Sequence, residues 1–569
     1  MKNTIKYLFV GALLISISFL TGCEDFLKPY GETGKYDGQI LWGNPSLAEG
    51  VLLRAYGKLQ TEYVRLDEYG NDDAVTNKLD HEMIVAATGG WSARNNPMDE
   101  YASIYSSMLQ INLFLENVDI VKWSSTSEVK DSLYKARLKG EAFGLRAFYG
   151  YLMLRNVGGK NVKGELLGYP IVTTSNLSFE EAKLPRNTYS DCVKQIFQDC
   201  DTAFKLLPLR WTDTGLNTDE KEVKGARYQN RINGITAKLV KARVALMAAS
   251  EAFKESGITM MQAAEYASEI ISINGFDKML SKDPQFYLQA RNVSDLSYFE
   301  GNSEIFWYSF IKSKSSNREA NFFPPSLYGS GLINPSQNLV NAFGDSYGYP
   351  IETSSVYDST KPYLYRDPRF YMYILSDGTY TEKGALIDIK NGEKDGIGKT
   401  VNSTRTGYYM RKLLDENVIL TPGLITATPH FYVFARYTEA LLIFAEAANQ
   451  AVGPDVAVGG FTARDIVQKI RARAGIFSTT FVDGLDKDGL ANLIRNERRI
   501  ELCFEGFRFW DLRRWNDLNA MNNVVNGIDL QTMTPIEVEK RVYQQYMIYA
   551  PIPYSETLKY NIEQNTGWN

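Results

Sequence analysis

The chain has 569 residues, of which 44% are hydrophobic and 23% charged. This composition is that of an ordinary globular protein, and the chain is long enough to bury a large core. This excludes intrinsic disorder, a collagen-like fibre and a small disulfide-rich scaffold. The formal net charge is -5 and no Lys- or Arg-rich block occurs, which gives nucleic-acid binding no support. Histidine occurs only at His81 and His430, both expected on the surface or in loops, so little remains for a histidine-based metal site or a Ser-His-Asp triad.

The first 22 residues have the pattern of a lipoprotein signal peptide. Lys2 and Lys6 precede an apolar run at 7–20 that is too short to be a good membrane-spanning helix. The run ends in Leu20-Thr21-Gly22-Cys23, the pattern of a bacterial lipobox, in which the cysteine receives the lipid. We therefore expect the mature chain to begin at lipidated Cys23, which would anchor it to a membrane. The alternative is an ordinary signal peptide followed by a chance cysteine.

Beyond the signal peptide, the hydrophobic pattern predicts helices, then a loop-rich stretch, then helices again. The first helices are expected at 99–122, 131–157, 187–207, 231–254 and 261–273. From about 274 to 430, Gly, Pro, Ser, Asn and Tyr are frequent and apolar runs are short, which predicts loops with a few short strands. Helices return at 431–450, 461–474, 487–505 and 507–519. Paired helices with short connections favour a mainly α, tetratricopeptide-like scaffold, although the repeat consensus is incomplete.

Three cysteines follow the signal peptide: Cys192, Cys200 and Cys503. An odd number in an exported protein cannot all pair internally. On one helix Cys192 and Cys200 would lie about 12 Å apart, and a disulfide requires Cα atoms within about 7 Å. We expect three buried thiols and no disulfide.

Glu497, Glu501 and Glu505 share one face of a predicted helix, which raises the question of paired-carboxylate catalysis. A general acid needs a raised pKa, whereas neighbouring arginines lower it. The same stretch is rich in such side chains, and Glu439 and Glu446 lie near Arg436 in the same way. We therefore expect structural ion pairs rather than a catalytic site. The charged neighbours in this stretch are Arg495, Arg498, Arg499, Arg508, Asp511, Arg513 and Arg514.

Several stretches in order carry a family resemblance. Towards the C-terminus these are RYTEALLIFAEAAN (436–449), IRARAG (470–475), ERRIELCFEGFRFWDLRRW (497–515) and PIPYSETLKYNIEQNTGW (551–568). Stretches 140–159, 184–208, 231–250, 365–370 and 407–413 agree with them in order. Together they resemble the SusD/RagB family of nutrient-binding outer-membrane lipoproteins of Bacteroidetes, over essentially the whole mature chain. Cys200 and Gly144 depart from the usual residues without affecting a visible function.

The resemblance implies one SusD-like domain over 23–569. Its helical scaffold would lie mainly at 45–273 and 431–519, with a loop-rich, ligand-binding insertion at about 274–430. Members of the family sit on the outer face of the outer membrane, present oligosaccharides or in some cases peptides to a SusC-like TonB-dependent transporter, and do not catalyse. No metal or other cofactor is expected. A surface glycoside hydrolase is the alternative from another functional class.

The shared motifs lie on the scaffold, so they do not mark the ligand site. Sugar binding needs flat aromatic faces and polar side chains, and loops present these best. Trp91 follows two glycines in a polar stretch and, by its position in the family, is the first candidate platform; core packing is the alternative. Its expected neighbours in the site are Asp72, Asp73, Arg94 and Asn95.

A second candidate group lies at 317–328. It consists of Arg318, Asn321, Phe323 and Tyr328. Trp307, Trp510 and Trp515 are expected in the core.

Overall fold

The computed structural model describes residues 38–61, 66–178, 180–181, 183–276, 302–310, 314–560 and 562–568. The expected signal peptide and Cys23 lie outside these residues. Within the described part, no helix combines the length and the apolar character needed to cross a membrane.

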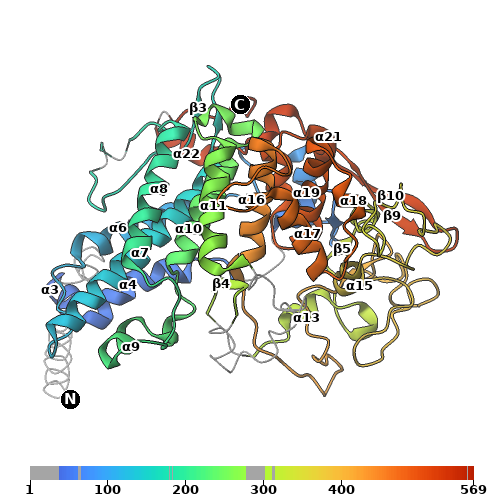
Figure 1. The fold of residues 1–569 in the computed structure, drawn as a ribbon, viewed down its shortest axis with the longest axis horizontal. Helices are drawn as coiled ribbons and strands as arrows, with labels where there is room; N and C mark the ends of the chain where they lie inside the picture. Colours follow the sequence, from blue (N-terminus) through green and yellow to red (C-terminus); the bar gives the residue numbers. More distant parts are fainter. Residues whose placement is uncertain are drawn as a thin grey trace, which may run out of the picture.

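The N-terminal helices form the left and central part of the molecule in Figure 1. Side chains that accept hydrogen bonds from free backbone N–H groups begin them, such as Ser127 on α7 and Thr188 on α8. Helix α7 packs on α6 and α8, and α10 packs on α8 and α11. The helices are α3 (Gly38–Gly43), α4 (Pro45–Gly57), α5 (Glu82–Val85), α6 (Tyr101–Asn117), α7 (Glu128–Val157), α8 (Tyr189–Leu206), α9 (Thr218–Lys224), α10 (Gly234–Ala249) and α11 (Met260–Asn274).

The C-terminal helices continue this layer, because α11 packs directly on α16, and α16 packs on α17 and α19 (Figure 1). Helix α16 is buried almost all round, as its run of Ala, Leu, Ile and Phe requires. The helices of this part are α16 (Tyr437–Val452), α17 (Ala463–Arg473), α18 (Thr480–Asp483), α19 (Lys487–Glu501), α20 (Arg508–Arg514), α21 (Leu518–Met521) and α22 (Tyr554–Lys559).

Between α11 and α16 lies the loop-rich part, at lower right in Figure 1. Its described helices are short: α13 (Asn317–Phe322), α14 (Gln337–Ala342) and α15 (Pro368–Tyr373). The described strands form two-stranded antiparallel ladders, and three of these (β1–β5, β4–β8 and β6–β7) hold the loops together or join them to the rest of the fold. The ladders pair β1 (Ala74–Val75) with β5 (Asn334–Pro335), β2 (Gly159–Lys160) with β3 (Leu166–Leu167), β4 (Ile305–Tyr308) with β8 (Val433–Arg436), β6 (Ile374–Leu375) with β7 (Tyr409–Met410), and β9 (Val524–Asp529) with β10 (Thr534–Lys540).

The mainly α fold and the order helices, loops, helices are confirmed, with boundary corrections. The helix expected at 231–254 is α10 followed by a separate 3₁₀ helix at Glu251–Ser256, and the helix expected at 507–519 is divided into α20 and α21. The helix expected from 431 begins only at Tyr437, because Val433–Arg436 forms β8 and pairs with β4. The helix expected to run to 505 ends at Glu501, and Phe504 takes a left-handed conformation with φ 63° that no helix continues through.

The predicted burial of cysteines and tryptophans is largely confirmed. Cys192, Cys200 and Cys503 are buried free thiols. Trp307 is fully buried and Trp515 is buried, whereas Trp510 is half-buried and packs on the core from its edge.

Candidate ligand-binding site

Trp91, the first candidate platform, lies in the core and is only 3% exposed. The turn at 86–90, with Gly89 at φ 107°, redirects the chain so that Trp91 points inward. Its ring packs edge-on against Trp568, with 4.8 Å between centroids, and its Nε1 donates to Asn96 Oδ1 at 3.0 Å. The prediction that Trp91 is exposed is wrong, and the alternative of core packing is confirmed.

Asp72 and Asp73 are also buried, which contradicts their assignment to a ligand surface. Arg508 Nε donates to Asp72 Oδ1 at 2.8 Å, and Arg499 Nε donates to Asp73 Oδ1 at 2.6 Å. Burial alone would raise the pKa of Asp72, but the two guanidinium groups outweigh it and hold the pKa below its usual range. Burial raises the pKa of Asp73, although Arg499 pairs with it. Both carboxylates are buried partners of arginines on α19 and α20, and they have no free face for a sugar.

Arg94 and Asn95 are the members of the first group that do reach the surface. The Arg94 guanidinium lies 4.2 Å from the centroid of the Tyr554 ring, a cation–π contact between the 91–96 loop and α22. With Trp91 and both aspartates buried, these two residues do not form a site by themselves.

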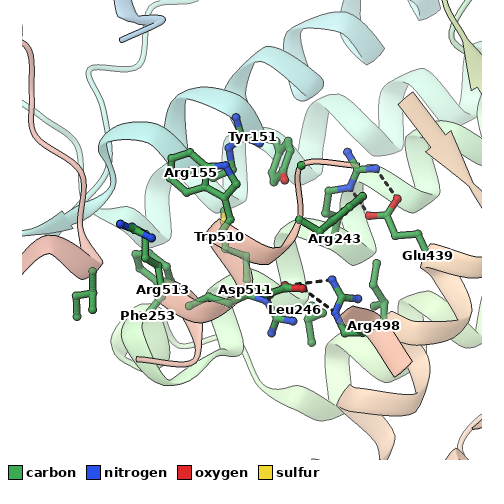
Figure 2. A pocket seen from close by; sticks show the side chains of 16 residues that line it. Tyr151, Arg155, Arg243, Leu246, Phe253, Glu439, Arg498, Trp510, Asp511 and Arg513 are labelled. Atoms are coloured by element: carbon green, nitrogen blue, oxygen red, sulfur yellow. Dashed lines mark hydrogen bonds and ion pairs between the residues drawn. The ribbon is translucent and has the colours of Figure 1, made fainter. Parts of the chain in front are cut away.

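The interior between the two helical groups contains a cavity of about 50 Å³, shown in Figure 2. In this view Arg243 reaches Glu439 and Arg498 reaches Asp511, with bonds of 2.6 and 3.1 Å. A volume of about 50 Å³ holds only a few water molecules. The cavity therefore cannot take a sugar ring, and it is a seam of the scaffold rather than a ligand site.

The glutamate row on α19 is ion-paired, as predicted, but with partners from elsewhere in the chain. Glu497 and Glu501 both accept from Arg369 of α15, at 2.7 and 2.9 Å. Arg473 of α17 donates to Glu501 at 2.6 Å. Burial would raise the pKa of Glu501, but Arg473 and Arg369 lower it to about 2. A carboxyl held ionised in this way cannot act as a general acid near neutral pH.

The other carboxylates of the C-terminal stretches are also paired with arginines, but not with the arginines nearest to them in sequence. Glu439 pairs with Arg243 rather than with its sequence neighbour Arg436. Arg436 instead binds Glu505, and Arg514 binds Glu446 at 2.5 Å. Of the two histidines, His430 lies against buried Glu319 at 3.0 Å, and His81 accepts from Met83 N at the start of α5.

The second candidate group is divided between core and surface. Arg318 is buried and donates to the carbonyl oxygens of Leu413 and Phe431, so its predicted ligand role is wrong. Asn321 is exposed, and Tyr328 is 51% exposed. Phe323 is almost fully buried but forms part of the floor of a surface hollow next to Tyr328.

This hollow, the Tyr328 hollow, is the candidate ligand site and has a volume of about 140 Å³. Tyr328 ends the 3₁₀ helix η7 (Pro325–Leu327) with φ 63°, a left-handed conformation rare for a large side chain. Lys394 Nζ lies 5.6 Å from the centre of its ring. The other lining residues are Phe323, Ser326, Leu327, Thr381, Lys383, Ala385, Glu416, Val418, Ile419, Leu420 and Thr421.

Polar groups of the hollow are fixed by the loops beneath it. Glu416 accepts from Arg411 Nε at 2.6 Å and from the backbone N–H of Glu382 at 2.6 Å. Lys383 Nζ donates to the carbonyl of Asn417 at 2.8 Å. Hydroxyl, carboxylate and ammonium groups therefore border an aromatic ring at the surface, which is the combination that a sugar requires.

The loop-rich part also exposes tyrosines that the sequence analysis did not select. Within the described residues, exposed tyrosines occur almost entirely between 328 and 380, with Tyr554 as the exception. Their concentration in a stretch rich in Gly, Pro and Ser was a usable signal. These tyrosines are Tyr328, Tyr347, Tyr365, Tyr371 and Tyr380.

No group of three or more His, Cys, Asp or Glu side chains in the described part of the chain is arranged to hold a metal ion.

Comparison with known proteins identifies the fold and the family. The SusD family model matches residues 296–568, and a model described as "Starch-binding associating with outer membrane" matches residues 47–222. SusD-like protein P38 of Formosa agariphila is 24% identical over 91% of this chain and 92% of its own length. SusD-like protein P2 of the same organism is 39% identical over 48% of this chain and 50% of its length.

Solved structures agree over nearly the whole chain. A SusD-like protein of Bacteroides fragilis superposes with a TM-score of 0.73 at 22% identity, covering 95% of this chain and all of that one. A SusD-like carbohydrate-binding protein of the same species gives 0.69 at 21% identity, with 91% and 99% covered. The two family models match stretches that do not overlap. One covers N-terminal helices, and the other covers most of the loop-rich part and the C-terminal helices. The chain belongs to the SusD family.

Proposed function

We propose that this protein is a cell-surface lipoprotein that binds oligosaccharide on the loop-rich face around the Tyr328 hollow. The observation that carries the proposal is the concentration of exposed tyrosines in the loop-rich part, one of which, Tyr328, borders hydroxyl and charged side chains in the hollow. Tyrosine offers an apolar ring face to a sugar and a hydroxyl that donates and accepts hydrogen bonds. The family-model description of starch binding and the carbohydrate-binding relative support the same ligand class.

The proposal includes delivery of the captured sugar to a SusC-like TonB-dependent transporter in the outer membrane. It also includes binding without turnover, since the carboxylates of the C-terminal motif are ionised and paired with arginines. If the purified protein released shortened products from an oligosaccharide, the non-catalytic assignment would be overturned.

Anchoring rests on Cys23. Changing Cys23 to Ala should move the protein from the outer membrane to the soluble fraction, because a lipidated cysteine is the attachment that the sequence predicts. Fractionation should be done in a strain without the transporter, where the partner cannot hold the protein in place. Unchanged surface retention there would contradict the anchor.

Ligand binding is tested with Tyr328→Ala and a matched control, Tyr554→Ala, which removes an exposed tyrosine of the scaffold. An aromatic contact is typically worth about 0.5–1.5 kcal/mol beyond area burial. Tyr328→Ala should therefore weaken oligosaccharide binding by roughly two- to twelvefold, with Tyr554→Ala unchanged. A screen of oligosaccharides and of short peptides by calorimetry provides the measurement. Binding of peptides alone would contradict the assignment to sugars.

A further inference from the structure

A hollow larger than the Tyr328 hollow lies on the helical scaffold rather than in the loop-rich part. A groove of about 590 Å³ lies on the scaffold between α6, the extended segment 170–177 and α22. This volume is within the range of about 300–1,000 Å³ that is typical of small-molecule sites, and it is about four times that of the Tyr328 hollow. In Figure 1 α6 and α22 lie in the left half of the molecule, far from α13 and the loops at lower right.

Three tyrosines form the wall of this scaffold groove: Tyr101 and Tyr105 of α6, and Tyr560 at the end of α22. The rings of Tyr101 and Tyr105 pack edge to face with 4.9 Å between centroids. The hydroxyl of Tyr105 donates to the carbonyl of Pro170 at 2.6 Å, which fixes the ring against the extended segment. Tyr101 is almost fully buried behind Tyr105, so the half-buried rings of Tyr105 and Tyr560 present the aromatic surface of the groove.

The rim of the groove is polar. Its charged lining residues, Glu556 and Lys559, pair with each other at 2.7 Å. Ser106, Thr174 and Ser175 add hydroxyl groups, and those of Thr174 and Ser175 also donate to the carboxylate of Glu116 behind the rim. Aromatic rings beside hydroxyl groups favour a ligand that has one apolar face and several hydroxyls.

We propose that the scaffold groove is a second binding site for a segment of a neutral oligosaccharide. This inference rests on the proposed function, since it assigns the same ligand class to a separate place on the molecule. Two separated sites on one chain can engage one long polysaccharide, and the second contact is then intramolecular and raises the avidity without new chemistry. Short oligosaccharides that cannot span both places would instead bind the two sites independently.

The test is calorimetry on the full mature chain in detergent, with the neutral probes maltohexaose, cellohexaose, xylohexaose and laminarihexaose. Leu109→Arg places a long charged side chain at the mouth of the groove, where Leu109 is 44% exposed. Leu558→Arg is the matched control, because Leu558 is 67% exposed on α22 but does not line the groove. Tyr560→Ala is a second groove variant, and melting temperatures check that all variants are folded.

We expect a bound probe to occupy two sites in the unmodified protein. Leu109→Arg and Tyr560→Ala should each weaken one site at least tenfold, Tyr328→Ala should weaken the other, and Leu558→Arg should weaken neither. A single site that is lost in Tyr328→Ala and intact in both groove variants would overturn this inference and leave the proposed function standing. Loss in the groove variants with Tyr328→Ala unaffected would support the groove and overturn the Tyr328 hollow as the ligand site.

Discussion

The C-terminal scaffold and the loop-rich face contain the same types of charged and aromatic residues, but the scaffold buries them and the loop-rich face exposes some of them. In the scaffold, arginines, carboxylates and aromatic rings are buried together: Arg514 contacts Glu446 and Asp511, and all three are buried. On the loop-rich face, Tyr328 keeps half of its surface exposed beside Lys394. A tryptophan or an aspartate in the sequence therefore does not indicate a ligand site until its partners are known.

The difference has an energetic side. Removing one member of a buried ion pair leaves an uncompensated charge in the interior, which typically costs about 3–5 kcal/mol. A surface side chain without such partners changes stability by about 0.5 kcal/mol or less. Substitutions should therefore separate the two regions clearly, with stability affected in one and ligand binding in the other.

Trp91→Ala gives the largest expected effect. Truncating a core Trp costs about 3–5 kcal/mol, and Trp91 packs on Phe509, Tyr543 and Trp568. Chemical denaturation should show this loss, with Tyr347→Ala as the control because Tyr347 is 56% exposed. Equal stability of the two variants would contradict the expectation that substitutions in the scaffold destabilise the fold more than substitutions on the loop-rich face.

Glu501→Gln should cost a similar amount, about 3–5 kcal/mol at neutral pH, because Arg369 and Arg473 lose their shared charge. The pKa of Glu501 is about 2 in the fold, against an ordinary value of 4.5. The ionised group therefore stabilises the fold above about pH 4.5, and this contribution is lost as the pH falls towards 2. Denaturation curves between pH 6 and pH 2 should fall more steeply for the unmodified protein than for the variant. Parallel curves would contradict the assignment.

Glu68→Gln should have the opposite sign and a smaller size. Burial, then the charge of Asp67, raises the pKa of Glu68 to about 8. The fold therefore favours the protonated acid, and stability is lost as the pH rises from about 4.5 through 8. The amide stays neutral and still accepts from the backbone N–H of Gly506, so the variant should be more stable at pH 8 by about 1–3 kcal/mol. A variant that is less stable than the unmodified protein at pH 8 would refute this.

Tyr328→Gly should have the smallest effect on stability. A non-glycine residue in the left-handed region costs about 1–2 kcal/mol, whereas glycine costs about 0.5–1 kcal/mol in chain entropy. The two nearly cancel, so the melting temperature should stay level or rise slightly while sugar binding weakens. A marked drop in melting temperature would show that the ring packs into the fold rather than serving a ligand.

The fold was accessible from the sequence because its signals are local. Helical periodicity and caps are contained in a few turns, as in α7 and α8, and glycine- and proline-rich composition marked the loops. The site was less accessible. The stretch around Trp91 is polar, yet Asp72 and Asp73 are neutralised by Arg499 and Arg508, more than 400 positions away, and no local pattern indicates that pairing. Tyr328 was selected on composition alone, and its exposure depends on the turn at Pro325–Leu327.

The β4–β8 ladder has a consequence for how ligand preference can change. It joins the entry and the exit of the loop-rich part, with Ile305 opposite Arg436, so both ends of that long excursion meet at one place on the scaffold. Loops between fixed, adjacent ends tolerate changes in length at little entropic cost. A different loop segment inserted between β4 and β8 would leave the contact between α10 and α16 intact. Recombination at this junction is then a route by which one scaffold acquires new specificities.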